Sequence, residues 1–310
     1  MQTTIRTVAE FKGIGLHSGR PVRMSVHPAP AGSGIRFLRS DVAADRSGRD
    51  PVVPARWDAV TPSRLCTVIA NDDGVSVSTI EHIMAALAGC GIHNAEVRID
   101  APEVPILDGS AAPFVAGLLR AGLRRQDAAV GCIEILRPVA VREGEAVARL
   151  EPAPAFEIGF TIDFEDAAIG RQEKHLRLAN GAFVRELSDC RTFCRQADVD
   201  AMRANGLALG GTYENAVVVD GDRILSPGGL RHPDEAVRHK MLDAVGDLAL
   251  AGGPILGRYT GNRAGHALTN RLLRTLFADA GAWRLTDCPP QRRRHLPGVG
   301  VDLADIPAVA

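Results

Sequence analysis

The sequence predicts an α+β fold made of two similar domains, each a β-sheet layered with helices. The chain of 310 residues is longer than one typical domain, and its 45% of apolar residues suffices for two cores. The same order of elements also occurs in both halves: strands, a helix, a glycine break, a strand and a second helix. We place the domains at 1–127 and 128–286, joined near 124–131, and expect a poorly ordered tail at 287–310.

The first half begins with segments typical of strands. Gly and Pro interrupt the stretches at 3–19, 21–30 and 34–40, a pattern that indicates hairpins rather than helices. The sequence NDDG at 71–74 predicts a turn between two further strands.

A helix, a strand and a second helix complete this half. The stretch TIEHIMAALAG predicts a helix that begins at Ser78 or Thr79, both plausible N-caps, and ends near Gly89. A strand at 93–100 and an amphipathic helix at 114–123 follow.

The second half has the same order. Placing His82 against His239 aligns the two halves, and the letters LLR occur in both of the later helices. We therefore predict strands at 131–143, 146–153 and 156–164, a helix at 237–250, a strand at 254–261 and a helix at 265–281.

Charge and cysteine usage exclude several classes of protein. Lys and Arg total 36 against 37 for Asp and Glu, which provides no basic face for nucleic acid. The six cysteines form no CxxC pair and no zinc-finger spacing. The N-terminus lacks the features of a signal peptide, and no apolar run approaches the roughly 20 residues that span a bilayer. We expect a soluble cytoplasmic protein with mostly buried thiols.

The helix at 237–250 carries an unusual polar side. His239, Asp243 and Asp247 are spaced four residues apart, which stacks them along one face, while apolar residues fill the opposite face. Two interpretations are open from this helix alone. The polar face is either solvated, or His239 and Asp243 bind a metal ion.

A catalytic zinc site needs three protein ligands and an open position for water. His82 is the best candidate for the third ligand, because it lies early on the matching helix of the first half. Glu81 lies about 100° around that helix, where it could act as a general base on water without being a ligand. The alternative is an ordinary carboxylate at a helix start beside a half-buried histidine.

Two other residues could take part in such chemistry. His266 begins a helix and could protonate a leaving amine or steady an oxyanion, with Asp247 orienting its imidazole. Its alternative interpretation is a capping or packing residue. Thr192 provides a hydroxyl donor, but nothing in the local pattern distinguishes it.

Several stretches together resemble one known family, the zinc-dependent UDP-3-O-acyl-N-acetylglucosamine deacetylases of lipid A biosynthesis. The similarity extends from about residue 2 to about residue 285. The stretches are GIGLHSG (13–19), STIEHIMAALAGCGIHNAEVRIDAPEVPILDGSAAPF (78–114), SDCRTF (188–193), LRHPDEAVRHKMLDAVGDL (230–248) and AGHALTN (264–270).

The resemblance implies a fold and a metal site. Members have two α+β domains with the active site between them. By resemblance, His82, His239 and Asp243 would be the zinc ligands and Glu81 the general base. Cys66 matches a cysteine that lies near the metal in members of the family.

The resemblance also implies roles in catalysis and binding. His266 would be the cationic partner of the oxyanion and of the leaving group, with Asp247 behind it, and Thr192 would donate to the oxyanion. Lys240 would contact the substrate, and Phe193 would lie against the sugar nucleotide.

The segment 194–225 resembles the family's βαβ insert, which forms a hydrophobic passage for the acyl chain. It departs from the family pattern at Cys194 and Arg195, where many members have a glycine and an apolar residue. This departure affects the local contacts and the acyl length accepted rather than the chemistry.

Together these observations predict a metalloamidase with Zn²⁺ that releases acetate from UDP-3-O-acyl-N-acetylglucosamine. We expect a monomer that binds this small amphiphile and no nucleic acid, without integral membrane association but with possible transient contact with the inner membrane face. Two alternatives are open: a zinc amidohydrolase that acts on another acylated amine, and a non-catalytic sugar-nucleotide-binding protein with a structural metal.

Overall fold

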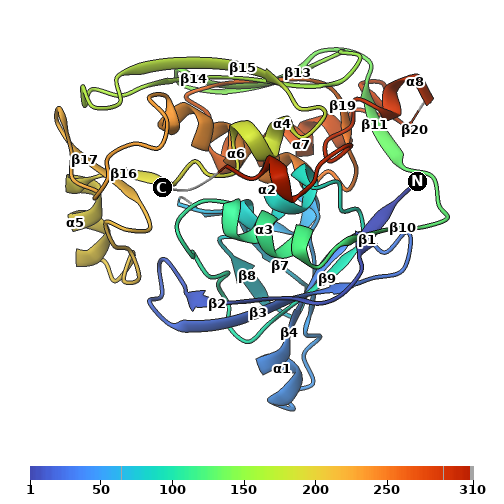
Figure 1. The fold of residues 1–310 in the computed structure, drawn as a ribbon, viewed down its shortest axis with the longest axis horizontal. Coiled ribbons are helices and arrows are strands. Elements are labelled where there is room, and N and C mark those ends of the chain that lie inside the picture. The colour runs from blue at the N-terminus through green and yellow to red at the C-terminus, as the bar shows by residue number, and fades with distance from the viewer. Residues whose placement is uncertain (64, 289, 308–310) are drawn as a thin grey trace.

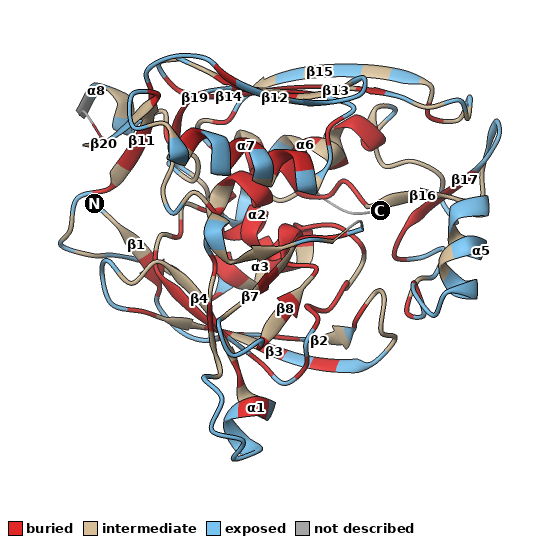
Figure 2. Ribbon diagram, turned by 180° about the vertical axis from the view of Figure 1, so that it is seen from behind, coloured by how far each residue is buried: buried red, intermediate tan, exposed pale blue. Residues whose placement is uncertain are grey.

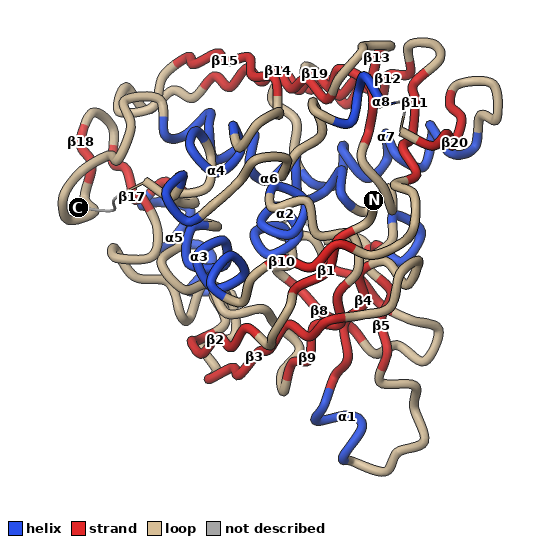
Figure 3. The backbone as a smooth tube through the Cα atoms, turned by 45° about the vertical axis from the view of Figure 1, so that its right-hand side comes forward, coloured by secondary structure: helices blue, strands red, loops and turns tan. Residues whose placement is uncertain are grey.

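The computed structural model describes residues 1–63, 65–288 and 290–307, and shows an α+β fold with two sheets on its outer faces. The main helices pack between the sheets (Figures 1 and 3). These helices are α2 (Glu81–Gly89), α3 (Ala112–Arg120), α6 (Glu235–Ala249) and α7 (His266–Ala278).

The first half of the chain builds one five-stranded sheet. Its side chains alternate as the pleat requires: Val22, Met24 and Val26 are buried, whereas Arg23 is exposed. The third and fourth strands of the sheet are parallel and the other neighbours antiparallel. In spatial order the strands are β2 (Ala9–Ile14), β3 (Pro21–Pro28), β9 (Ala95–Ile99), β4 (Ile35–Arg39) and β5 (Val52–Pro54).

Five strands of the seven-stranded sheet in the second half repeat this arrangement. Again only the third and fourth strands of the series are parallel. The series is β12 (Val139–Glu143), β13 (Ala146–Glu151), β19 (Ile255–Asn262), β14 (Phe156–Asp163) and β15 (Arg171–Arg177).

A further antiparallel pair also recurs in each half. β1 (Thr3–Ile5) pairs with β10 (Leu123–Arg125), and β11 (Gly131–Ile135) pairs with β20 (Trp283–Asp287). The first pair is a separate two-stranded sheet, whereas β11 also pairs in parallel with β19 and joins the large sheet of the second half. The prediction of two similar α+β halves is therefore confirmed, while the domain boundary at 127 and 128 stays a prediction.

Each half carries an insert at the same point of the repeat, between its fifth strand and its first central helix. The first insert is a small sheet of β6 (Val60–Thr61), β7 (Val68–Ala70) and β8 (Ser76–Ser78), and it contains the predicted turn at 71–74. The second insert follows α4 (Ala182–Glu186) and includes β16 (Phe193–Arg195), α5 (Gln196–Ala204), β17 (Val217–Asp220) and β18 (Arg223–Ile224).

The second insert contains a βαβ unit, because β16 and β17 are parallel and α5 connects them. The helix α5 has no buried residue and lies at the rim of the molecule, whereas α2 is buried almost throughout (Figure 2).

The two central helices α2 and α6 approach very closely. A Cβ atom added at Gly246 would lie 2.1 Å from the carbonyl oxygen of Glu81, so only glycine allows this contact. The packing around it is apolar and buried, with Ile83 from α2 and Val245 from α6. Gly246 therefore determines how far the start of α2 lies from the middle of α6.

Several predicted boundaries are wrong. The N-cap of α2 is Ile80, without a side-chain cap, rather than Ser78 or Thr79. Ser78 completes β8, and Thr79 adopts a φ of 58° while its hydroxyl donates to Glu103. Helix α3 begins at Ala112 and ends at Arg120 rather than running from 114 to 123.

Other elements carried no clear sequence signal. They include β5, β10 and β15, whose pairing partners are distant in the chain or separated by irregular segments. Short helical turns were also not predicted: α1 (Ser40–Ala44), η1 (Trp57–Ala59), α8 (Pro290–Arg293) and η2 (Leu303–Asp305).

The described part of the tail contacts the body of the molecule. Leu296 is buried, and Asp305 accepts a hydrogen bond from the guanidinium of Arg185 at 2.8 Å. Residues 289 and 308–310 lie outside the described residues. The expectation of a poorly ordered tail at 287–310 stays a prediction.

The contact at Gly246 generates a prediction about stability. Gly246→Ala would force a Cβ atom against the Glu81 carbonyl, and we expect a loss of about 1–3 kcal/mol in the free energy of unfolding. Chemical denaturation measures this. The control is Gly281→Ala, where the nearest atom to an added Cβ atom is 3.5 Å away, an ordinary van der Waals distance, and no positive φ requires glycine. Equal destabilisation by both substitutions would contradict the prediction.

Candidate active site and metal centre

The packing of α2 against α6 brings three predicted ligands together. Nε2 of His82 lies 3.7 Å and Nε2 of His239 lies 3.3 Å from Oδ1 of Asp243. All three residues are buried, and their potential ligand atoms lie within 4.8 Å of one another. They could therefore hold one metal ion between the two halves of the chain.

The protonation states in this cluster suit metal binding. The Nδ1–H of His239 donates to the carbonyl oxygen of Cys190 at 3.0 Å, which leaves the Nε2 lone pair directed at the cluster. Burial lowers the pKa of both histidines, and for His82 burial together with His239 lowers it to about 3. The donor set is thus two neutral imidazoles and a carboxylate, which is a zinc-binding combination.

Asp243 is held ionised. Burial opposes its ionisation, but His239 and Lys240 outweigh that effect and lower its pKa. The ammonium of Lys240 donates to Oδ2 of Asp243 at 2.8 Å, so Oδ1 is the oxygen that faces both imidazoles. Burial opposes the charge of Lys240, yet Asp243 raises its pKa. The predicted contact of Lys240 with substrate stays a prediction.

The predicted base and acid lie beside the cluster. Nε2 of His266 is 3.9 Å from Oε1 of Glu81 and 4.0 Å from Oδ2 of Asp243. The Nδ1–H of His266 donates to Oδ2 of Asp247 at 2.9 Å, which is the predicted orienting contact. The structure therefore brings together the imidazole, its orienting carboxylate and Glu81.

The protein environment raises the pKa values of both Glu81 and His266. Burial raises the pKa of Glu81 to about 7. For His266, burial acts in the opposite sense, but Asp247 and Glu81 outweigh it and raise its pKa to about 9. Between these values Glu81 can accept a proton while His266 carries one.

Thr67, which the sequence patterns do not single out, bonds to Glu81 and to Asp247, the carboxylate that orients His266. Its main-chain N–H donates to Oε2 of Glu81 at 3.0 Å, and its hydroxyl donates to Oδ1 of Asp247 at 2.5 Å. Thr67 stands just before β7 in a run that predicts only a strand. No local signal distinguishes it. The Cys190 carbonyl was missed for the same reason, since every residue has one.

Of the remaining predicted residues, Phe193 contacts a residue of the metal cluster. The ring of Phe193 lies edge-on to that of His239, with centroids 6.3 Å apart. The N–H of Thr192 donates to the carbonyl of Gly109, which links the second insert to the first half. Cys66 is buried beside Thr67, and burial, with the charge of Glu81, raises its pKa to about 11. Cys66 is therefore a neutral thiol at pH 7.

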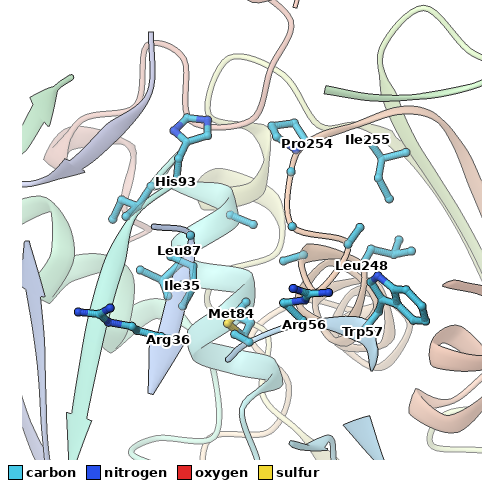
Figure 4. A pocket seen from close by; sticks show the side chains of 18 of the residues that line it. Ile35, Arg36, Arg56, Trp57, Met84, Leu87, His93, Leu248, Pro254 and Ile255 are labelled. Carbon is cyan, nitrogen blue, oxygen red and sulfur yellow. The ribbon is translucent and has the colours of Figure 1, made fainter. Parts of the chain in front are cut away.

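A cavity of about 530 Å³ lies elsewhere between the halves (Figure 4). Leu87 of α2 and Leu248 of α6 line it, with Ile35 and Ile255 from the two sheets. Among its described lining residues, none belongs to the metal cluster or to the acid–base pair. The chemistry is therefore not located in this cavity.

In the described ranges 1–63, 65–288 and 290–307, no helix combines the length and the apolar character that crossing a membrane requires.

Comparison with known proteins covers most of the chain. Residues 2–278 match the family described as UDP-3-O-acyl N-acetylglycosamine deacetylase, LpxC. A protein of Phenylobacterium zucineum named UDP-3-O-acyl-N-acetylglucosamine deacetylase is 52% identical over 284 residues, covering 92% of this chain and 96% of its own length. A protein of Shewanella violacea with the same name is 45% identical over 293 residues, covering 94% of each chain. The chain belongs to the UDP-3-O-acyl N-acetylglycosamine deacetylase family.

Proposed function

We propose that this chain hydrolyses the acetamide of UDP-3-O-acyl-N-acetylglucosamine, giving acetate and UDP-3-O-acyl-glucosamine, the committed step of lipid A biosynthesis. The observation that carries this proposal is the convergence of a His₂Asp cluster with Glu81 and His266 where α2 packs on α6. The names of the relatives supply the substrate.

We propose zinc as the metal. His82, His239 and Asp243 would hold it, and these three protein ligands leave a fourth position open, as a catalytic site requires. When bound, zinc would polarise the acetamide carbonyl and lower the pKa of the attacking water.

Glu81 would accept the proton of the attacking water. Its Oε2 accepts a hydrogen bond from the Thr67 N–H. Oε1, which lies on the His266 side, can therefore accept the proton. The water oxygen forms a bond to the acetyl carbon, and the bond from that carbon to the sugar nitrogen then breaks.

His266 would act while protonated. Asp247 holds Nδ1, which directs Nε2 towards the space beside Glu81. From there the imidazolium can stabilise the oxyanion and give its proton to the leaving nitrogen. We propose that the Thr192 hydroxyl donates to the same oxyanion.

We propose that Lys240 and Phe193 contact the substrate, and that the second insert receives the acyl chain. Apolar side chains that are exposed on this insert support that role, because a bound acyl chain would cover them. They are Leu207, Leu209 and Tyr213.

Cellular location and assembly complete the proposal. We propose a cytoplasmic monomer that meets its amphiphilic substrate in solution or at the inner face of the membrane. The family and the chemistry of the substrate support this.

The first experiment measures acetate release from UDP-3-O-acyl-N-acetylglucosamine before chelation, after chelation and after zinc is restored. We expect activity to disappear with the metal and to return with zinc, because the bound zinc would polarise the carbonyl and lower the pKa of the attacking water. Folded, zinc-loaded protein that releases no acetate would contradict the proposed function.

Substitutions separate the base from the ligands. Glu81→Ala should lower kcat by about 10²–10⁴-fold and retain zinc, because it removes a proton acceptor and no metal ligand. Asp243→Ala should instead lower the zinc content, measured by atomic absorption on the purified protein. Each variant is the control for the other. Near-normal turnover of zinc-loaded Glu81→Ala, or unchanged zinc in Asp243→Ala, would contradict the assignments.

The dependence of kcat/KM on pH should be bell-shaped. Activity rises as Glu81 loses its proton, at or below about 7 because a bound cation lowers its pKa further. Activity falls as His266 loses its proton, at or below about 9 because the same cation also lowers the pKa of this histidine. His266→Gln should remove the alkaline limb. If that limb persists in this variant, another group is responsible for it.

A further inference from the structure

Thr67 bonds to two carboxylates that belong to different halves of the chain. Glu81 lies on α2 in the first half and Asp247 on α6 in the second, and Thr67 lies in the first insert. We propose that Thr67 is a positioning residue whose hydroxyl fixes the His266–Asp247 pair relative to Glu81. This inference rests on the proposed roles of Glu81 and His266.

Each carboxylate accepts a hydrogen bond from Thr67 with one oxygen and faces His266 with the other. Glu81 gives Oε2 to the Thr67 N–H, which leaves Oε1 beside His266. Asp247 gives Oδ1 to the Thr67 hydroxyl, which leaves Oδ2 for Nδ1 of His266. Because the last torsion of a carboxylate side chain is broad, a bond to its second oxygen is what fixes its orientation.

The bond to Asp247 has the character of a strong contact. The oxygens are 2.5 Å apart, within the range of a hydroxyl that donates to an ionised carboxylate. Thr67 is 3% exposed and Asp247 is also buried, so water cannot easily replace the hydroxyl.

The consequence concerns the space between Oε1 of Glu81 and Nε2 of His266, which are 3.9 Å apart. The substrate nitrogen and the attacking water must both reach these atoms. Without the hydroxyl, Asp247 would lose the bond that ties it to the first insert, and the His266–Asp247 pair could move relative to Glu81. Small errors in the position of reacting groups reduce rate more than they reduce binding.

The test compares Thr67→Val, which keeps the shape and the main-chain N–H, with Thr67→Ser, which keeps the hydroxyl. Thr67→Val should lower kcat by about 10–100-fold, with KM within about threefold and zinc content unchanged. Thr67→Ser should recover kcat to within about fivefold. Thr67→Ala is a second variant without the hydroxyl, in case Thr67→Val does not fold.

The matched control is Thr4→Val. Thr4 is equally buried, but its hydroxyl accepts from the main-chain N–H of Ala29 in the first half. This variant should lose stability without losing kcat. Wild-type kcat in both Thr67→Val and Thr67→Ala, or a loss in Thr67→Ser as large as that in Thr67→Val, would overturn the inference.

A spectroscopic measurement separates this inference from the proposed function. The Nδ1–H proton of His266, assigned by its absence in His266→Gln, should shift in Thr67→Val and return towards its wild-type position in Thr67→Ser. Inactive wild-type enzyme would refute the proposed function, while the proton shift would still decide whether the hydroxyl orients the imidazole. An unchanged resonance in Thr67→Val would overturn the inference.

Discussion

The contact between Gly246 of α6 and the main chain of Glu81 on α2 is the constraint on which the site depends. One missing Cβ atom lets the start of α2 lie against the middle of α6. From that contact, His82 reaches the cluster that His239 and Asp243 begin on one helical face. A longer distance between the helices would move His82 away from the two ligands of the second half, even if each half folded correctly.

The structural repeat explains how the two inserts bring further residues to the site. Both inserts leave the fold at the same point of the series, just before the central helix of each half. The first insert therefore carries Thr67 to the start of α2, and the second carries Phe193 to the ring of His239. The two sheets supply rigid outer layers, while the residues with chemistry come from helices and inserts between them.

Sequence patterns predicted the parts of the site that depend on local geometry. A spacing of four residues places His239, Asp243 and Asp247 on one helical face, and the repeat selected His82 as their partner. Contacts made by main-chain groups, such as the Cys190 carbonyl, leave no trace in residue identity. Thr67 was missed because its role depends on packing between halves, and the Ile80 cap because tertiary contacts outweighed N-cap preference.

The alignment of the halves has a consequence for symmetry. Helix α2 corresponds to α6 with His82 opposite His239, but Ala86 stands where the second half has Asp243, and Arg238 stands where the first has Glu81. The two halves repeat the same arrangement of strands and helices, but they contribute different residues to the site. Two copies of the first half would hold two bases and lack the carboxylate ligand, and two copies of the second would hold two carboxylates and lack the base. The cluster of His82, His239 and Asp243, with Glu81 beside it, therefore depends on the differences between the two halves at the positions where they meet.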